Sequence, residues 1–162
     1  MNTAARVVVP TVRGRNISLI AAMNIEGMVY HEVIQQTNVN ASIFCEFLIK
    51  LFEELAKNEI GNAWLILDNA SIHKTQQVRD LVAEKGFHLM FLPPYSPMVN
   101  PIEEVFSKIK FYARNVLADP TNSIHLKDII NQSVETITAA NCNNFYTHMY
   151  MQLPAAAAGE PL

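Results

Sequence analysis

The sequence predicts a mixed α/β fold in which helices cover a β-sheet. Three patterns indicate it: short apolar runs of strand length at 63–67 and 87–92, a pair of strand-like segments around a turn at 24–27, and longer segments with a helical apolar period. The chain has 162 residues, and 50% of them are hydrophobic. This is enough for one domain with a real core.

The first clear elements are a predicted antiparallel hairpin. Residues 16–23 alternate in polarity and are predicted as one strand, and residues 28–35 are predicted as the returning strand. The segment between them has the composition of a tight turn, with Gly27 near its tip. Before the hairpin, valines favour β structure but Pro10 interrupts them, so residues 1–15 are interpreted as a solvated turn.

A helix is predicted next, with Asn40 as its N-cap and its end near Asn58. Its apolar residues recur at steps of three and four, and its charged residues fall on the other side. The apolar stripe is therefore predicted as core, and it consists of Ile43, Phe44, Phe47, Leu48, Leu51, Phe52 and Leu55.

A strand–helix–strand unit follows. The apolar run 63–67 is too short for a helix and ends abruptly at Asp68, as a buried strand does. A helix is predicted from about Lys74 to Glu84, where Gly86 ends it, and residues 87–92 form the second strand. Two strands joined by one helix are expected to be parallel neighbours with a right-handed crossover.

A stiff loop with three prolines, at residues 93–97, leads to a helix that is predicted to begin near Pro101, with Asn100 as its N-cap. Glu103 lies in the first turn of this helix. Its carboxylate has two explanations: a favourable interaction with the helix dipole, or membership of a functional site. Asp68 leaves the carboxyl end of a strand, where open α/β sheets bind ligands. We expect the loop to direct Glu103 toward that same edge.

The remaining chain is predicted to be helical. The helix that contains Glu103 continues to about Ala118, a second runs from 124 to 138 behind a Ser123 cap, and a short third runs from 141 to about 150. The inward residues of the second helix are predicted to be Ile129, Ile130, Val134 and Ile137. Residues 1–153 are expected to form the domain and residues 154–162 a flexible tail.

Composition narrows the class of protein. Cys45 and Cys142 have no metal-like spacing and are interpreted as reduced thiols. No apolar run reaches the length of a membrane span, and the N-terminus lacks a signal-peptide pattern, so we expect no membrane association. The formal net charge of −3 does not favour tight nonspecific DNA binding, but it is compatible with a nuclease whose site is itself acidic.

Two linked motifs resemble the DDE transposase family, specifically its Tc1/mariner-like and IS630-like branch. The first motif is the strand that ends in DNASIH, residues 68–73, and the second is LPPYSP, residues 92–97, followed by NPIE, residues 100–103. Residues 69–102 separate the two carboxylates, a spacing for which that branch is known. The resemblance covers residues 9–110 well and the rest weakly.

This resemblance implies an RNase H-like fold with a mixed sheet flanked by helices. It also implies divalent-metal-dependent cleavage and transfer of DNA strands, as in transposition and integration, with two Mg²⁺ or Mn²⁺ ions. Asp68 and Glu103 would be the second and third metal-binding carboxylates. The implied partners are transposon ends and target DNA, with a possible homodimer. The implied location is the nucleus in a eukaryote and the cytoplasm otherwise.

The family fold begins with a strand that carries the first catalytic Asp. No acidic residue precedes Glu26, and Glu26 lies in the hairpin turn, which is the wrong location. Residues 1–15 would then be the connector to the second family strand. We therefore expect an N-terminally truncated domain that lacks its first strand, has an unpaired sheet edge and is inactive alone, because a two-metal site needs three carboxylates.

Whether the chain is an enzyme stays open. The alternatives to an impaired transposase catalytic domain are a non-enzymatic remnant that binds nucleic acid or protein, and an unrelated α/β protein whose motifs match by chance. An upstream Asp in the same polypeptide would distinguish the first two.

Four further residues are candidate nucleic-acid contacts. Asn69 and His73 follow Asp68 closely, and His73 either makes a local hydrogen bond or touches a DNA phosphate or a metal-bound water. Lys110 and Arg114 lie seven and eleven residues after Glu103 and therefore share its helix face. They either contact DNA phosphates along that face or belong to an ordinary solvated surface.

Overall fold

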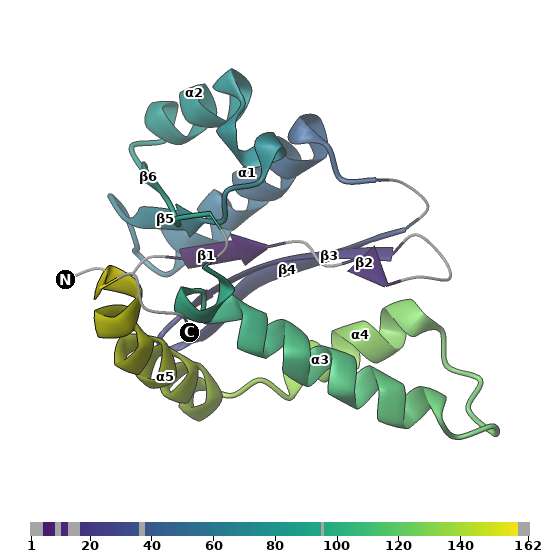
Figure 1. The fold of residues 1–162 in the computed structure, drawn as a ribbon. Helices are drawn as coiled ribbons and strands as arrows, with labels where there is room; N and C mark the ends of the chain where they lie inside the picture. The colour runs from purple at the N-terminus through teal and green to yellow at the C-terminus, as the bar shows by residue number, and fades with distance from the viewer. Residues whose placement is uncertain (1–4, 9–10, 13–16, 36–37, 95, 159–162) are drawn as a thin grey trace.

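The computed structural model describes residues 5–8, 11–12, 17–35, 38–94 and 96–158. A six-stranded mixed sheet lies between two layers of helices (Figure 1). The sheet order is β2-β3-β1-β5-β6, and β4 also pairs with β3. The strands are β1 (Ala5–Val8), β2 (Thr11–Val12), β3 (Ile17–Asn24), β4 (Gly27–Gln35), β5 (Trp64–Leu67) and β6 (His88–Phe91).

The helices divide between the two faces of the sheet, as Figure 1 shows. One layer contains α1 (Ala41–Lys57) and α2 (Gln76–Glu84). The other layer contains α3 (Ile102–Leu117), α4 (Leu126–Glu135) and α5 (Ala139–Ala158). Two short 3-10 helices, η1 (Ser71–Lys74) and η2 (Pro97–Val99), lie in the loops that follow β5 and β6.

Strand β3 joins the two hydrophobic cores because it is buried on both faces. Its residues 17, 19, 21 and 23 pack in the core under α3, α4 and α5. Ile20 and Ala22 pack in the other core, with α1, α2, Leu65 and Leu67. This alternation is the period-two pattern of a strand between two helical layers. The predicted α/β class, a mixed sheet flanked by helices, is confirmed.

The prediction that the first strand is missing is wrong. Strand β1 lies at the centre of the sheet, antiparallel to β3 and parallel to β5. It fills the edge that was expected to be unpaired. The prediction failed because β1 is only four residues long and Pro10 follows it closely, so the local sequence gives a weak strand signal. The basic segment Arg13-Gly14-Arg15 lies outside the described residues.

The predicted hairpin is confirmed as β3 and β4. The Asn24 side-chain oxygen Oδ1 accepts hydrogen bonds from the backbone N–H groups of Glu26, at 2.9 Å, and Gly27, at 3.0 Å. Gly27 has a φ of 153°, which a glycine adopts without the steric cost that a side chain adds. Asn24 and Gly27 therefore fix the turn that sets the register of the two strands.

Helix α1 begins where the sequence predicts. The Asn40 side chain accepts a hydrogen bond from the N–H of Ile43 at 3.0 Å and so caps the helix. The predicted stripe is buried, apart from Ile43, which is partly buried at the margin of the core. The stripe packs the helix onto β3, β4 and β5.

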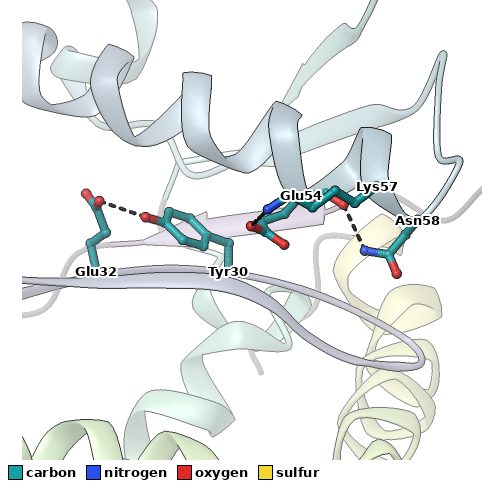
Figure 2. A network of polar contacts seen from close by, with 5 residues as sticks. All are labelled: Tyr30, Glu32, Glu54, Lys57 and Asn58. Carbon is teal, nitrogen blue, oxygen red and sulfur yellow. Dashed lines mark hydrogen bonds and ion pairs between the residues drawn. The ribbon is translucent and has the colours of Figure 1, made fainter.

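Polar contacts within β4 and within α1 lie at the surface where the two elements meet (Figure 2), and Lys50 of α1 joins them by pairing with Glu32. The Tyr30 hydroxyl donates to Glu32 at 2.8 Å, and the same carboxylate pairs with Lys50 of α1. Burial and the Glu32 contact raise the pKa of Tyr30 above its usual range. At the end of the helix, Glu54 pairs with Lys57 at 2.6 Å.

Several other helix boundaries differ from the predictions. The helix expected from Lys74 to Glu84 is divided into η1 and α2. Ser123 does not cap α4, because the helix begins at residue 126 with His125 in the N-cap position. The four inward residues predicted for this helix are nevertheless buried: Ile129, Ile130, Val134 and Ile137.

Helix α5 is longer than predicted and runs through Pro154 to Ala158. Residues 154–158, predicted as part of a flexible tail, are therefore helical, while 159–162 lie outside the described residues. Four consecutive alanines follow Pro154, and alanine has the highest helix propensity, which favours continuation of the helix.

Both cysteines are buried, and neither forms a disulfide. Burial raises the pKa of both the Cys45 and the Cys142 thiols, which disfavours the reactive thiolate. A search of the described helices finds none that is both long and apolar enough to span a bilayer.

The Asn40 cap predicts a stability change. Asn40→Ala should lower the free energy of unfolding by about 1 kcal/mol, because the Ile43 N–H loses its partner. For a domain of this size, that corresponds to a decrease of about 2–4 °C in Tm. Asn115→Ala, at an exposed position within α3, is the control and should not lower Tm. Equal losses in the two variants, measured by thermal unfolding, would contradict the cap.

Candidate metal and DNA site

The site is built at the carboxyl ends of two parallel strands. β5 and β6 pair in register from Trp64 opposite His88 to Leu67 opposite Phe91, which confirms the predicted parallel neighbours. Leu65 and Leu67 are fully buried in the core under α1 and α2. Asp68 follows Leu67 directly and therefore lies at the carboxyl end of β5.

Asp68 is held in position through one of its two carboxylate oxygens. Oδ1 accepts a hydrogen bond from the N–H of Ala70 at 2.9 Å. Nδ1 of His73 lies 2.8 Å from the same oxygen, an ion-pair distance without the direction of a good hydrogen bond. The Asp68 side chain remains 34% exposed. Within the described part of the chain, Oδ2 is left for another partner.

The negative charge of Asp68 affects the pKa of Glu103. Burial would raise the pKa of Asp68, but His73, the Ala70 N–H and the charge of Lys74 together lower it below its ordinary value. Glu103 shows the opposite balance: burial and the negative charge of Asp68 raise its pKa, although Lys110 opposes them. Asp68 and Glu103 are therefore brought near one another, as the sequence predicts.

Glu103 is positioned by the start of α3. Its N–H donates to the backbone carbonyl of Asn100 at 3.0 Å, which closes the first turn. The predicted side-chain cap by Asn100 is wrong, because Pro101 occupies the N-cap position. The Asn100 side chain is only 4% exposed, and its Oδ1 has no hydrogen-bond partner among the described residues. The backbone N–H of Asn100 donates to the carbonyl of Pro97 at 3.0 Å and closes the turn of η2.

His73 is a buried residue. Its side chain is 1% exposed, and its ring lies 4.4 Å, centroid to centroid, from Phe44 of α1. The ring nitrogens of His73 make no hydrogen bond within the described residues, so the predicted local hydrogen bond is not seen, and contact of His73 with nucleic acid stays a prediction. Sequence could not predict the burial, because it depends on packing between η1 and α1.

The remaining predicted contacts lie around the carboxylates. Lys110 is partly buried, and its charge lowers the pKa of Glu103, in agreement with a shared helix face. Arg114 is exposed about one turn further along α3, and Asn69 is partly buried beside Asp68. Contact of these three residues with DNA stays a prediction.

Strand β1, which pairs in parallel with β5, contains no acidic residue. It has the sequence ARVV, and its Val7 pairs with Leu67, the residue before Asp68. Across the described ranges, no group of three His, Cys, Asp or Glu residues is arranged to hold a metal ion. The absence of the first catalytic Asp stays a prediction, and the place of β1 beside β5 was not predicted because β1 was interpreted as part of a turn.

The profile of a family described as DDE superfamily endonuclease matches residues 3–127. The match spans most of the chain, so the protein belongs to this family. The predicted membership of the DDE superfamily is confirmed, and the Tc1/mariner-like branch stays a prediction. No curated protein sequence matches the chain.

The crystal structure of the catalytic domain of Mos1 mariner transposase superposes with a TM-score of 0.74 at 17% identity, over 99% of this chain and 84% of that one. The Mos1 paired-end complex with its left transposon end gives 0.76 at 19%, over 93% and 45%. A simian T-cell lymphotropic virus intasome with PP2A regulatory subunit B56 gamma gives 0.67 at 12%, over 83% and 48%. At these identities the comparison establishes the fold, that of a transposase catalytic domain.

The raised pKa of Glu103 predicts a pH-dependent stability. A carboxyl whose folded pKa exceeds its unfolded value, here 4.5, stabilises the fold below that value, and this contribution is lost as pH rises through the folded pKa. Glu103→Gln should therefore have a higher Tm than the wild type near pH 7 without divalent cations. The difference should vanish below about pH 4.5.

Thermal unfolding between pH 3.5 and 8 measures this difference. The matched control is Glu84→Gln, at an exposed carboxylate at the end of α2, which should give the same difference at every pH. A Glu103→Gln advantage that is largest at low pH would contradict the assignment.

Proposed function

We propose that this chain is a DDE transposase catalytic domain that binds DNA and holds one divalent cation, Mg²⁺ or Mn²⁺, between Asp68 and Glu103. The observation that carries the proposal is that Asp68, at the end of β5, leaves Oδ2 without a protein partner among the described residues, while Glu103 in the first turn of α3 lies near enough for the Asp68 charge to raise its pKa. Structures of Mos1 transposase, which shares this fold, include Mg, Mn and transposon-end DNA. Family membership supports extending both partners to this chain.

The donor set fits one hard cation. Mg²⁺ prefers carboxylate oxygens and keeps several waters, so two protein carboxylates are a sufficient anchor for weak binding. Asp68 offers Oδ2, since its two protein contacts use Oδ1. The raised pKa of Glu103 means that its negative charge is poorly compensated, and a nearby cation would compensate it. When bound, such an ion supplies Lewis-acid stabilisation of charge on a phosphodiester oxygen.

Cleavage and transfer of DNA strands with two ions, which the resemblance to transposases implies, would need more anionic ligands than Asp68 and Glu103 supply. The resemblance implies a third carboxylate, and β1, the strand beside β5, carries none. We therefore assign to the residues of this chain the binding of DNA and of one ion. Strand cleavage requires a further carboxylate.

Titration with Mn²⁺ tests the cation site. The electron paramagnetic resonance signal of the unbound ion should show about one weak site per chain. Asp68→Asn and Glu103→Gln should each abolish it, because each removes one of two anionic ligands. Asp80→Asn removes an exposed acid on α2 and is the matched control. Unchanged binding in both site variants would refute the proposed site.

Restoring a carboxylate on β1 tests the reason for inactivity. Val8 is the last residue of β1, and β1 pairs in parallel with β5, so Val8→Asp should add a carboxylate near the strand end that Asp68 follows. We expect Mn²⁺-dependent nicking of DNA in Val8→Asp and not in the isosteric control Val8→Asn. Equal nicking by the wild type, abolished in Asp68→Asn, would show that two carboxylates suffice.

The shared face of α3 predicts a DNA contact. Lys110→Ala and Arg114→Ala should each weaken binding to a DNA duplex and lower the slope of log K against log salt by about one for each phosphate that is no longer neutralised. Lys57→Ala, on α1 across the sheet, is the charge-matched control and should leave the slope unchanged. Fluorescence anisotropy at several salt concentrations measures both quantities. If all three variants weaken binding equally, the contact is nonspecific.

A further inference from the structure

We infer that His73 is a positioning residue for the cation site: it fixes the Asp68 carboxylate so that Oδ2 is presented to the ion. This inference rests on the proposed function, because it assumes that Asp68 is a cation ligand. It assigns a role to a buried side chain that is not itself a ligand of the ion.

The contacts of Asp68 divide its two oxygens into a structural one and an open one. Oδ1 faces both the Ala70 N–H, at 2.9 Å, and His73 Nδ1, at 2.8 Å. A carboxylate with two neighbours on one oxygen cannot rotate about its Cβ–Cγ bond without losing both. The second oxygen is thereby held in one direction before any ion binds, which lowers the cost of ordering the ligand.

The ring of His73 is itself fixed by the core. It is 1% exposed and packs against Phe44 with a ring-to-ring angle of 38°. Phe44 is fully buried on α1, the long helix that covers this face of the sheet. The position of Nδ1 is therefore set by the packing of α1, and the rigidity of the core extends through His73 to Asp68.

An unsatisfied polar atom accompanies this arrangement. Neither ring nitrogen of His73 makes a hydrogen bond within the described residues: Nδ1 has only its ion-pair contact with Asp68, and Nε2 has no polar partner there. An unpaired polar atom in a core costs stability, so a leucine would pack against Phe44 without that penalty. Stability alone therefore does not favour a histidine at position 73. The contact of its Nδ1 with Asp68 accounts for its presence.

The test compares variants that separate packing from positioning. His73→Leu keeps an apolar contact with Phe44 and removes Nδ1, whereas His73→Asn retains an N–H near the place of Nδ1. Val78→Ala is the packing control, because Val78 is fully buried in the same core. His88→Leu is the histidine control, at the opposite end of the parallel strands from Asp68. Each variant is measured for Mn²⁺ affinity, for Tm without the ion and for the rise in Tm at saturating Mn²⁺.

We expect His73→Leu to weaken Mn²⁺ binding about 10- to 100-fold and to reduce the Mn²⁺-induced rise in Tm. His73→Asn should return affinity close to that of the wild type. Val78→Ala should lower the Tm without the ion but leave Mn²⁺ affinity unchanged, and His88→Leu should leave affinity unchanged. A purely structural role would move the Tm without the ion and not the affinity.

Wild-type affinity in His73→Leu, with binding abolished in Asp68→Asn, would overturn the positioning role and leave the cation site intact. Wild-type affinity in Asp68→Asn would instead overturn the proposed function on which the inference rests. Should His73→Leu fail to fold, His73→Gln carries its amide one bond further from the backbone and gives the same comparison. Weakened binding is expected there too, and wild-type affinity would again overturn the inference.

Discussion

The parallel pairing of β5 with β1 and β6 is the constraint on which the site depends. This pairing holds β5 between β1 and β6, so that its backbone N–H and C=O groups find partners on both sides. Leu65 and Leu67 anchor the strand in the core, and the next residue is a carboxylate that must leave it. The strand therefore delivers Asp68 to the sheet edge toward which the loop after β6 turns α3.

Asp68 and Glu103 have different electrostatic surroundings, which lower the pKa of Asp68 and raise the pKa of Glu103. Asp68 is kept ionised by donors and positive charges that arrive from the short segment after its strand. Glu103 lies in the first turn of α3, where its carboxyl is half-buried near the negative charge of Asp68. Pairs of titratable groups with opposed shifts mark functional sites. A cation between these groups would relieve the strain that the fold imposes on Glu103.

Most of the fold was predictable from local sequence patterns. Residues that act on near neighbours, such as Asn24 in its turn and Asn40 at its helix, were predicted correctly because their partners lie within three residues. Strand β1 was missed because its evidence is not local: four residues followed by a proline become a central strand only through pairing with β3 and β5. The extent of α5 was missed for a related reason, since one proline was given more weight than the alanines after it.

The site was also predictable only in those parts that depend on local sequence patterns. The placement of Asp68 and Glu103 near one another was predictable because a strand end and a helix start have strong sequence signals, while their role in a metal site stays a prediction. The burial of His73 and the orphaned oxygen of Asn100 follow from packing between elements that lie far apart in sequence. The place of β1 beside β5 became clear only once the register of β1 was known.

The central claim is that Asp68 and Glu103 together hold one cation, with Asp68 contributing Oδ2. Anomalous diffraction from a crystal grown with Mn²⁺ tests it most directly. The account predicts one anomalous peak that contacts Oδ2 of Asp68 and a carboxylate oxygen of Glu103, with Oδ1 still facing Ala70 and His73. A peak that contacts only one of the two carboxylates, or a well-ordered site without any peak, would contradict it.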